Sequence, residues 1–131
     1  MHLELAAEEA RALFETLDDE HRCLINEYDP DTARRPSKRR MGNLDTITSA
    51  ITKLLCRQPK IAATHYVDLD AMVSCVLELD DKETACVALL LSKRAKDYRK
   101  VSASYPLPHT GVIAAIDQRA EVLEMVVARI T

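Results

Sequence analysis

Scarcity of glycine is the feature that most limits how this chain can fold, since its 131 residues include two glycines, Gly42 and Gly111. Average usage would supply about nine in a chain of this length. Tight β-hairpins need glycine at turn positions with positive φ, and the chain has no Asn-Gly, Asp-Gly or Gly-Gly pair. Aromatic residues make up 4% of the chain, so its 47% hydrophobic residues are mainly aliphatic. This composition predicts an all-α fold, a compact bundle of four to five helices in a single domain over residues 1–131.

Apolar residues that recur every three or four positions predict where the helices lie. The patterns cover residues 3–28, 43–57, 68–79, 80–100 and 110–131. Asn43 is the expected N-cap of the second helix. Asp80 is the expected N-cap of the fourth, because Glu83 three residues later can complete a capping box. One bent helix over 68–100 is the alternative to a break at this point, and residues 60–67 fit either a loop or a short extended segment.

Charge is distributed unevenly along the chain, although the net charge is −3. Residues 1–33 carry ten acidic and two basic side chains, and residues from Met41 onward carry eleven of each. Between them lie five basic residues and no acidic one: Arg34, Arg35, Lys38, Arg39 and Arg40. Two prolines and Gly42 accompany them, so residues 30–43 are expected to form one long, flexible basic loop between the first two helices.

Several interpretations of this basic loop are open. Its cations suit the acidic surface of a partner protein or the phosphates of a nucleic acid. They also suit a solvated loop whose charge offsets the acidic first helix. Nucleic acid is the weaker candidate, because no aromatic residue lies among the cations to stack on bases. Ser37, within Arg-Arg-Pro-Ser, is a candidate phosphorylation site, where a phosphate would place roughly two negative charges among the cations.

A second basic patch is predicted near the end of the helix over 80–100. Lys93, Lys96 and Lys100 share one face at helical spacing, and Arg99 lies beside them. The patch could extend a binding surface. Alternatively, it is a solvated helix end whose cations interact favourably with the helix dipole.

The last helix carries more apolar surface than one neighbour can cover. Its apolar residues step alternately by three and four positions, and they include Ile116, Leu123, Val127 and Ile130. This heptad-like seam fits two arrangements, in which the helix either fills the centre of the bundle or pairs with a second copy of itself. The second arrangement predicts an oligomer contact along these four residues.

Sequence motifs of catalysis are missing from the chain. It contains no G-x-S-x-G, P-loop, G-x-G-x-x-G or H-E-x-x-H pattern. Its histidines and cysteines lack the close spacing that is typical of zinc ligands. We therefore expect no enzymatic activity, no metal site and no other cofactor.

Composition and the N-terminal segment also indicate in which cellular compartment to expect the protein. The longest uninterrupted apolar run, residues 87–91, is far shorter than the ~20 residues that a membrane span requires. The N-terminal segment soon becomes acidic, which is unlike a signal peptide. Four widely spaced cysteines are expected to be reduced and buried. These features indicate a cytoplasmic protein with no membrane partner, or a nuclear protein if the host is a eukaryote.

Taken together, the sequence favours a non-enzymatic regulatory or adaptor protein that acts by protein–protein binding, as a homodimer. Segregated charge and surplus apolar helix faces support this hypothesis. The alternative is a nucleic-acid-binding accessory protein that uses the basic loop over residues 34–40.

Overall fold

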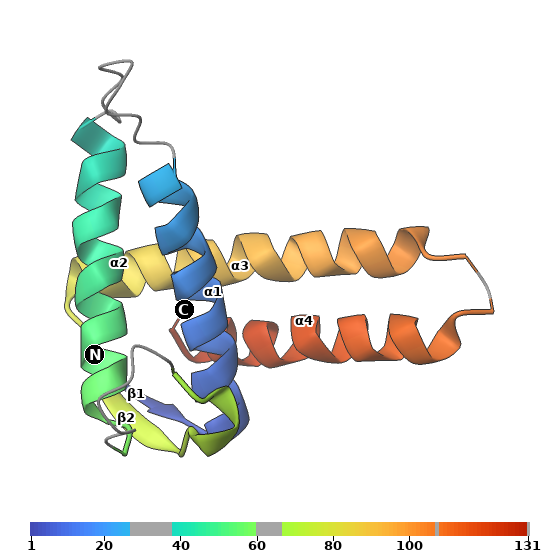
Figure 1. Cartoon of the computed structure of the whole chain (residues 1–131), viewed down its shortest axis with the longest axis horizontal. Helices are drawn as coiled ribbons and strands as arrows, with labels where there is room; N and C mark the ends of the chain where they lie inside the picture. The colour runs from blue at the N-terminus through green and yellow to red at the C-terminus, as the bar shows by residue number, and fades with distance from the viewer. Residues whose placement is uncertain (27–37, 60–66, 107, 131) are drawn as a thin grey trace.

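The computed structural model describes residues 1–26, 38–59, 67–106 and 108–130, which form long helices and a small sheet. The helices are α1 (Ala7–Asn26), α2 (Lys38–Cys56), α3 (Asp81–Ser104) and α4 (Thr110–Ile130). Strand β1 (His2–Leu5) pairs with strand β2 (Cys75–Glu78), and a short 3-10 helix, η1 (Leu69–Ala71), precedes β2. The fold is mostly helical, as predicted from the composition, but it contains a sheet that the prediction omitted (Figure 1).

The two-stranded sheet occupies places where helices were expected. Its strands are antiparallel, with Leu3 opposite Leu77 and Leu5 opposite Cys75. Leu3, Leu5 and Leu77 are buried while the side chains that alternate with them are exposed, so each strand shows the period of two that strands require. The helix predicted over 68–79 is therefore wrong, as is the bent helix over 68–100. The first helix begins at Ala7 because residues 2–5 pair with a distant strand.

The start of α2 also differs from the prediction. The helix begins at Lys38 instead of at an N-cap at Asn43, so the predicted loop over residues 30–43 extends too far. Lys and Arg are good helix formers, and a single interior glycine such as Gly42 costs a helix only about 1 kcal/mol. Residues 38–43 are therefore helical, and the rest of the predicted loop, residues 30–37, lies outside the described residues.

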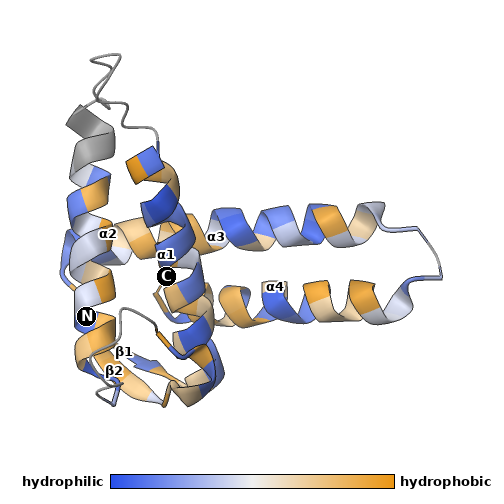
Figure 2. Ribbon diagram, in the orientation of Figure 1, coloured by the Kyte–Doolittle hydropathy of each residue, from blue (hydrophilic) through white to orange (hydrophobic). Residues whose placement is uncertain are grey.

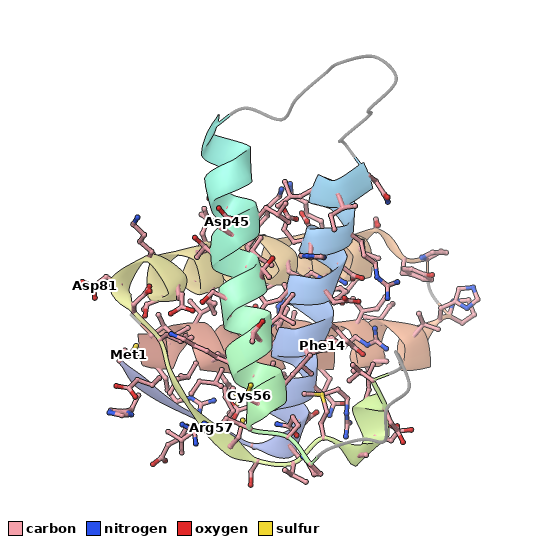
Figure 3. The ribbon with its side chains drawn as sticks, turned by 60° about the vertical axis from the view of Figure 1, so that its left-hand side comes forward. Met1, Phe14, Asp45, Cys56, Arg57 and Asp81 are labelled. Atoms are coloured by element: carbon pink, nitrogen blue, oxygen red, sulfur yellow. The ribbon has the colours of Figure 1, made fainter. Side chains whose placement is uncertain are left out.

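The helices form two layers. In Figures 1 and 3, α1 and α2 lie next to each other and cross over α3 and α4. Side chains from both layers and from the sheet meet in one aliphatic core. Its fully buried members include Leu3, Leu13, Leu17, Ile47, Leu54, Leu77, Leu79, Val87, Leu91 and Val126. Two ion pairs connect the layers at other points, Arg94 of α3 with Asp19 of α1 and Arg129 of α4 with Glu9 of α1.

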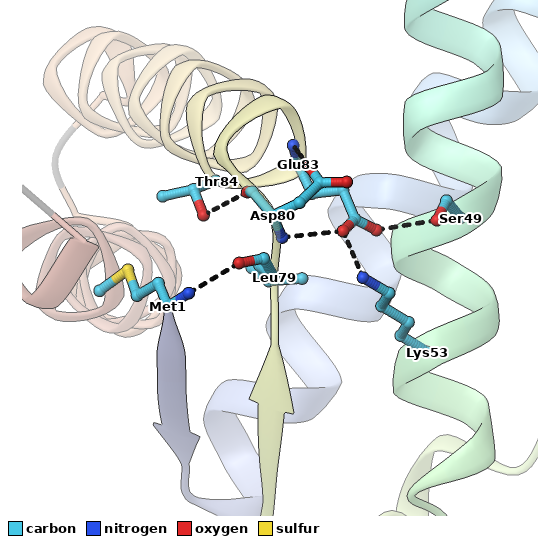
Figure 4. Close-up of polar contacts among 7 residues, drawn as sticks. All are labelled: Met1, Ser49, Lys53, Leu79, Asp80, Glu83 and Thr84. Atoms are coloured by element: carbon cyan, nitrogen blue, oxygen red, sulfur yellow. Dashed lines mark hydrogen bonds and ion pairs between the residues drawn. The ribbon is translucent and has the colours of Figure 1, made fainter.

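The start of α3 is fixed by the capping box that the sequence predicts, which is confirmed. The Asp80 carboxylate accepts a hydrogen bond of 2.8 Å from the Glu83 backbone N–H, and the Asp80 N–H donates one of 3.0 Å to the Glu83 carboxylate (Figure 4). The Glu83 side chain also accepts from the Ser49 hydroxyl at 2.8 Å and forms an ion pair with Lys53. Glu83 is 1% exposed, so a buried carboxylate joins α3 to α2.

Glu83 should make the stability of the fold depend on pH. Burial by itself would raise its pKa, but donors from Asp80, Lys53 and Ser49 stabilise the charged form and lower the pKa below its ordinary value. Its contribution to stability is therefore complete above about pH 4.5 and is lost as the pH falls through the lower pKa of the folded state. We expect the difference in unfolding free energy between the parent chain and Glu83→Gln to shrink as the pH is lowered toward about 3 in chemical denaturation.

The control for this pH dependence is Lys82→Gln, an exposed substitution on the same helical turn. Lys82 is exposed and pairs with no described carboxylate, so the difference between Lys82→Gln and the parent should stay nearly constant there. A constant difference for Glu83→Gln as well would show that the Glu83 carboxylate is not stabilised in its charged form.

α3 and α4 continue side by side as a two-helix arm, defined here as residues 96–119, whose far end projects past α1 (Figure 1). Among the described residues of the arm, Ser102 is the one buried side chain. Its hydroxyl donates a 2.6 Å hydrogen bond to Asp117 of α4. Arg99 forms ion pairs with Asp117 at 3.2 Å and with Glu124 at 3.0 Å. Polar contacts between the two helices therefore take the place of an apolar core in the arm.

Candidate functional site

The candidate site is the outer face of α3 and α4, the face turned away from α1 and α2. Arg94 and Tyr98 mark the opposite, inner side of α3, since Arg94 pairs with Asp19 of α1 and its side chain also contacts Tyr98. Helical geometry places Ser92, Lys96 and Lys100 on the outer side. A groove of about 550 Å³ runs between the helices there, lined by Ser92, Ala95, Lys96, Arg99, Lys100, Glu124, Val127 and Ala128.

The α3 side of this outer face carries a row of cations. Lys93, Lys96 and Lys100 follow one another at helical spacing and are all exposed. Leu89 continues the row toward the start of α3, and its side chain is 66% exposed. No described carboxylate forms an ion pair with these three lysines. The row is therefore free to bind acidic groups from outside this part of the chain.

The α4 side of the outer face carries a matching row of carboxylates. Asp117, Glu121 and Glu124 recur at helical spacing, and exposed Met125 and Ala128 lie close to them. Figure 2 shows that the part of α3 that extends past α1 is largely hydrophilic and that α4 is more hydrophobic. The outer face thus combines a cationic row, an anionic row and apolar side chains between them.

Arg99 holds the two rows together within the chain. Its guanidinium donates hydrogen bonds of 3.0 and 3.1 Å to the two oxygens of Glu124. These bonds lower the pKa of Glu124 and raise the pKa of Arg99, so both groups stay charged at neutral pH. The pair shows which turns of α3 and α4 lie level with each other.

The four residues of the predicted second basic patch therefore do not act alike in the structure. Lys93, Lys96 and Lys100 lie exposed on the outer face, whereas Arg99 is engaged with α4. The lysine spacing was visible in the sequence. The row of carboxylates on α4 was also visible, but its position beside the lysines depends on the pairing of the two helices and was missed.

The predicted oligomer seam on α4 lies mainly against the chain itself. Leu123 is 2% exposed and belongs to the core. Ile116, Val127 and Ile130 are half-buried, and Val127 lines the outer groove. Contact with a second copy through all four residues stays a prediction. The face of α4 that is more open to solvent lies next to this seam and belongs to the outer face.

The predicted basic loop is only partly within the described residues. Arg34, Arg35 and Ser37 lie outside them. The backbone of Lys38, Arg39 and Arg40 forms the first turn of α2, but their side chains are outside the description. Partner binding by these residues and phosphorylation of Ser37 stay predictions.

Other features of the described residues give less support for a binding or catalytic site. A cavity of about 280 Å³ lies beside α1 and α4, and its acidic Glu8 and Glu15 are balanced by Arg11 and Arg119. Within the described ranges, no three His, Cys, Asp or Glu side chains are placed to hold a metal ion. None of the described helices has the length and hydropathy needed to cross a membrane.

The cysteines differ in part from the expectation of buried, reduced thiols. None of the four forms a disulfide in the structure. Cys23 and Cys56 are exposed, which contradicts the expected burial, and Cys75 and Cys86 are only half-buried. Cys75 lies on a strand of the sheet, not on a helix.

Comparison with known proteins gives no relationship: no family model matches the chain, and no curated protein or solved structure is significantly similar to it. The function must therefore be argued from the geometry of the outer face.

Proposed function

We propose that this chain is a non-enzymatic regulatory or adaptor protein that acts by binding a protein partner through the outer face of α3 and α4. The observation that supports the proposal most is the projection of the α3–α4 pair past α1, with a groove along the face that no described element covers. Helix pairs usually bury such a face against a further helix, as in four-helix bundles.

The composition of the face supports a protein partner over a nucleic acid. Its lysines could neutralise phosphates, but Asp117, Glu121 and Glu124 lie alongside them and would repel a polyanion. A protein surface can present both signs of charge together with apolar side chains for the groove. Nucleic-acid binding through residues 34–40 remains the competing proposal and does not involve this face.

The proposed function predicts that reversing the charge of the lysine row weakens the binding of a partner. Affinity capture would compare the parent chain with Lys93→Glu, Lys96→Glu and Lys100→Glu combined, and each captured protein would then be purified and titrated by calorimetry. A genuine partner should bind the triple variant at least about tenfold more weakly, since several charge contacts change sign.

The matched control combines Arg22→Glu and Arg57→Glu, two exposed cations of α1 and the end of α2 that lie away from the outer face. This control should bind the partner like the parent chain. Equal binding by the parent and the lysine-row variant would contradict the proposal. Capture of nucleic acid instead, with affinity that falls steeply as salt rises, would favour the competing proposal.

A further inference from the structure

The outer face is complementary in charge to a copy of itself, and we propose that the occupant of this face is a second copy of the chain, arranged with α3 of each copy over α4 of the other. This inference rests on the proposed function, because it names the partner of the same surface. The two copies together would form an antiparallel four-helix bundle from their α3–α4 pairs, with the α1–α2 layers on the outside.

The first step is the charge pattern. Three lysines lie along α3, and three carboxylates lie along α4. Consider a two-fold axis that runs parallel to the helices and between the two copies. It places the lysine row of each copy over the carboxylate row of the other copy. A two-fold axis across the helices would place lysines over lysines, and like charges at an interface cost affinity. Charge therefore selects the first arrangement among isologous dimers.

The second step is the axial register. Arg99 bonds to both Asp117 and Glu124, so it is level with the helical turn between them, which contains Glu121. Lys100 follows Arg99 directly and is level with the same turn, while Lys96 is one turn away, level with Glu124.

Rotation about an axis along the helices leaves these levels unchanged. Lys100 of each copy then faces Glu121 of the other, and Lys96 faces Glu124. No sliding of one copy along the other is needed to bring opposite charges together, so the internal register of α3 and α4 also serves the contact between copies.

The third step is the size of the surface. Helix α3 has 24 residues, so it is about 36 Å long, and two adjacent helices present a face roughly 20 Å wide. The area is roughly 700 Å² per copy, close to the ~800 Å² that each partner buries in a standard stable interface. Leu89, 66% exposed, supplies a large apolar side chain to it, and Val127 and Ala128 line its groove. The aliphatic stems of the lysines add further apolar contact while their ammonium groups reach the carboxylates.

A different occupant fits less well. An acidic amphipathic helix from another protein would match the lysine row, but it would also lie against Glu121 and Glu124 with like charge. A basic helix would meet the lysines in the same way. A rotated copy of this chain matches both rows together, which is why the second copy is the favoured occupant.

The test is a charge swap across the proposed contact, measured by sedimentation velocity at micromolar concentrations. The parent chain should dimerise. Lys100→Glu alone, and Glu121→Lys alone, should each raise the dimer dissociation constant about tenfold, because two attractive contacts per dimer become repulsive. An equimolar mixture of the two variants should recover the parent affinity, since every contact in the mixed dimer again joins opposite charges.

Both substitutions are at exposed positions, and circular dichroism melts of the diluted variants should match the parent. A monomeric parent would overturn the inference, as would unchanged dimerisation of the single variants or a mixture that fails to recover. If the parent is monomeric but a captured partner still loses affinity for the lysine-row variant, the inference fails while the proposed function stands. If the swap behaves as expected and no other partner is captured, the protein acts through self-association.

Discussion

Replacing Leu91 by alanine is expected to lower the free energy of unfolding by about 3 kcal/mol, whereas the same replacement at Leu89 should change it by less than about 0.5 kcal/mol. The two leucines lie two positions apart on α3 and are chemically identical. Leu91 is 0% exposed and packs between the helix layers, whereas Leu89 is 66% exposed on the outer face. Truncation of a buried leucine loses its transfer free energy and leaves a cavity, and truncation of an exposed one does neither.

Chemical denaturation of the dilute protein would measure both losses without a contribution from self-association. Leu89→Ala then has a second use, because it should weaken the proposed dimer at higher concentration while leaving the folded chain intact. Equal destabilisation by the two substitutions would mean that α3 is rotated about its axis from the orientation described, and the outer face would then be wrongly assigned.

Local signals explain which parts of the fold the sequence could predict. The break before α3 was predictable because a capping box involves residues three apart, Asp80 and Glu83. The start of α4 at Thr110 was predictable for a similar reason, since a proline-containing connector precedes it. Each of these features is decided by neighbours within a few positions, and each was found where it was expected.

The sheet could not be predicted in the same way. Residues 2–5 become a strand because residues 75–78 lie beside them, and the two segments are distant in the sequence. Leucines at positions 3 and 5 fit a helix as well as a strand when read alone. Burial of both on one side of the sheet settles the choice, and that burial exists only after the chain has folded.

The candidate site, too, could be predicted from the sequence only in part. The spacing of Lys93, Lys96 and Lys100 gave a shared face without any structure. Its importance depends on Asp117, Glu121 and Glu124, which become neighbours only when α4 packs against α3. The apolar seam of α4 was a true pattern, but Leu123 shows that much of it serves packing within the chain.

Glu83→Ala is expected to be about as destabilising as Leu91→Ala, near 3 kcal/mol, although it removes a charged side chain and not an apolar one. The substitution eliminates half of the capping box, which by itself contributes about 1 kcal/mol. It also removes the charged acceptor of the Ser49 hydroxyl, and a hydrogen bond to a charged group contributes roughly 1.5–3 kcal/mol.

Two further variants separate the causes by thermal and chemical unfolding. Glu83→Gln keeps an acceptor oxygen for the Asp80 N–H but loses the ion pair with Lys53, so it should lose about half as much stability as Glu83→Ala. Lys82→Ala, exposed on the same turn, should stay within about 0.5 kcal/mol of the parent. If Glu83→Ala were as mild as Lys82→Ala, the junction of α2 with α3 would not depend on this carboxylate. A large loss at Glu83 alone would show that a buried polar contact holds the start of α3 against α2.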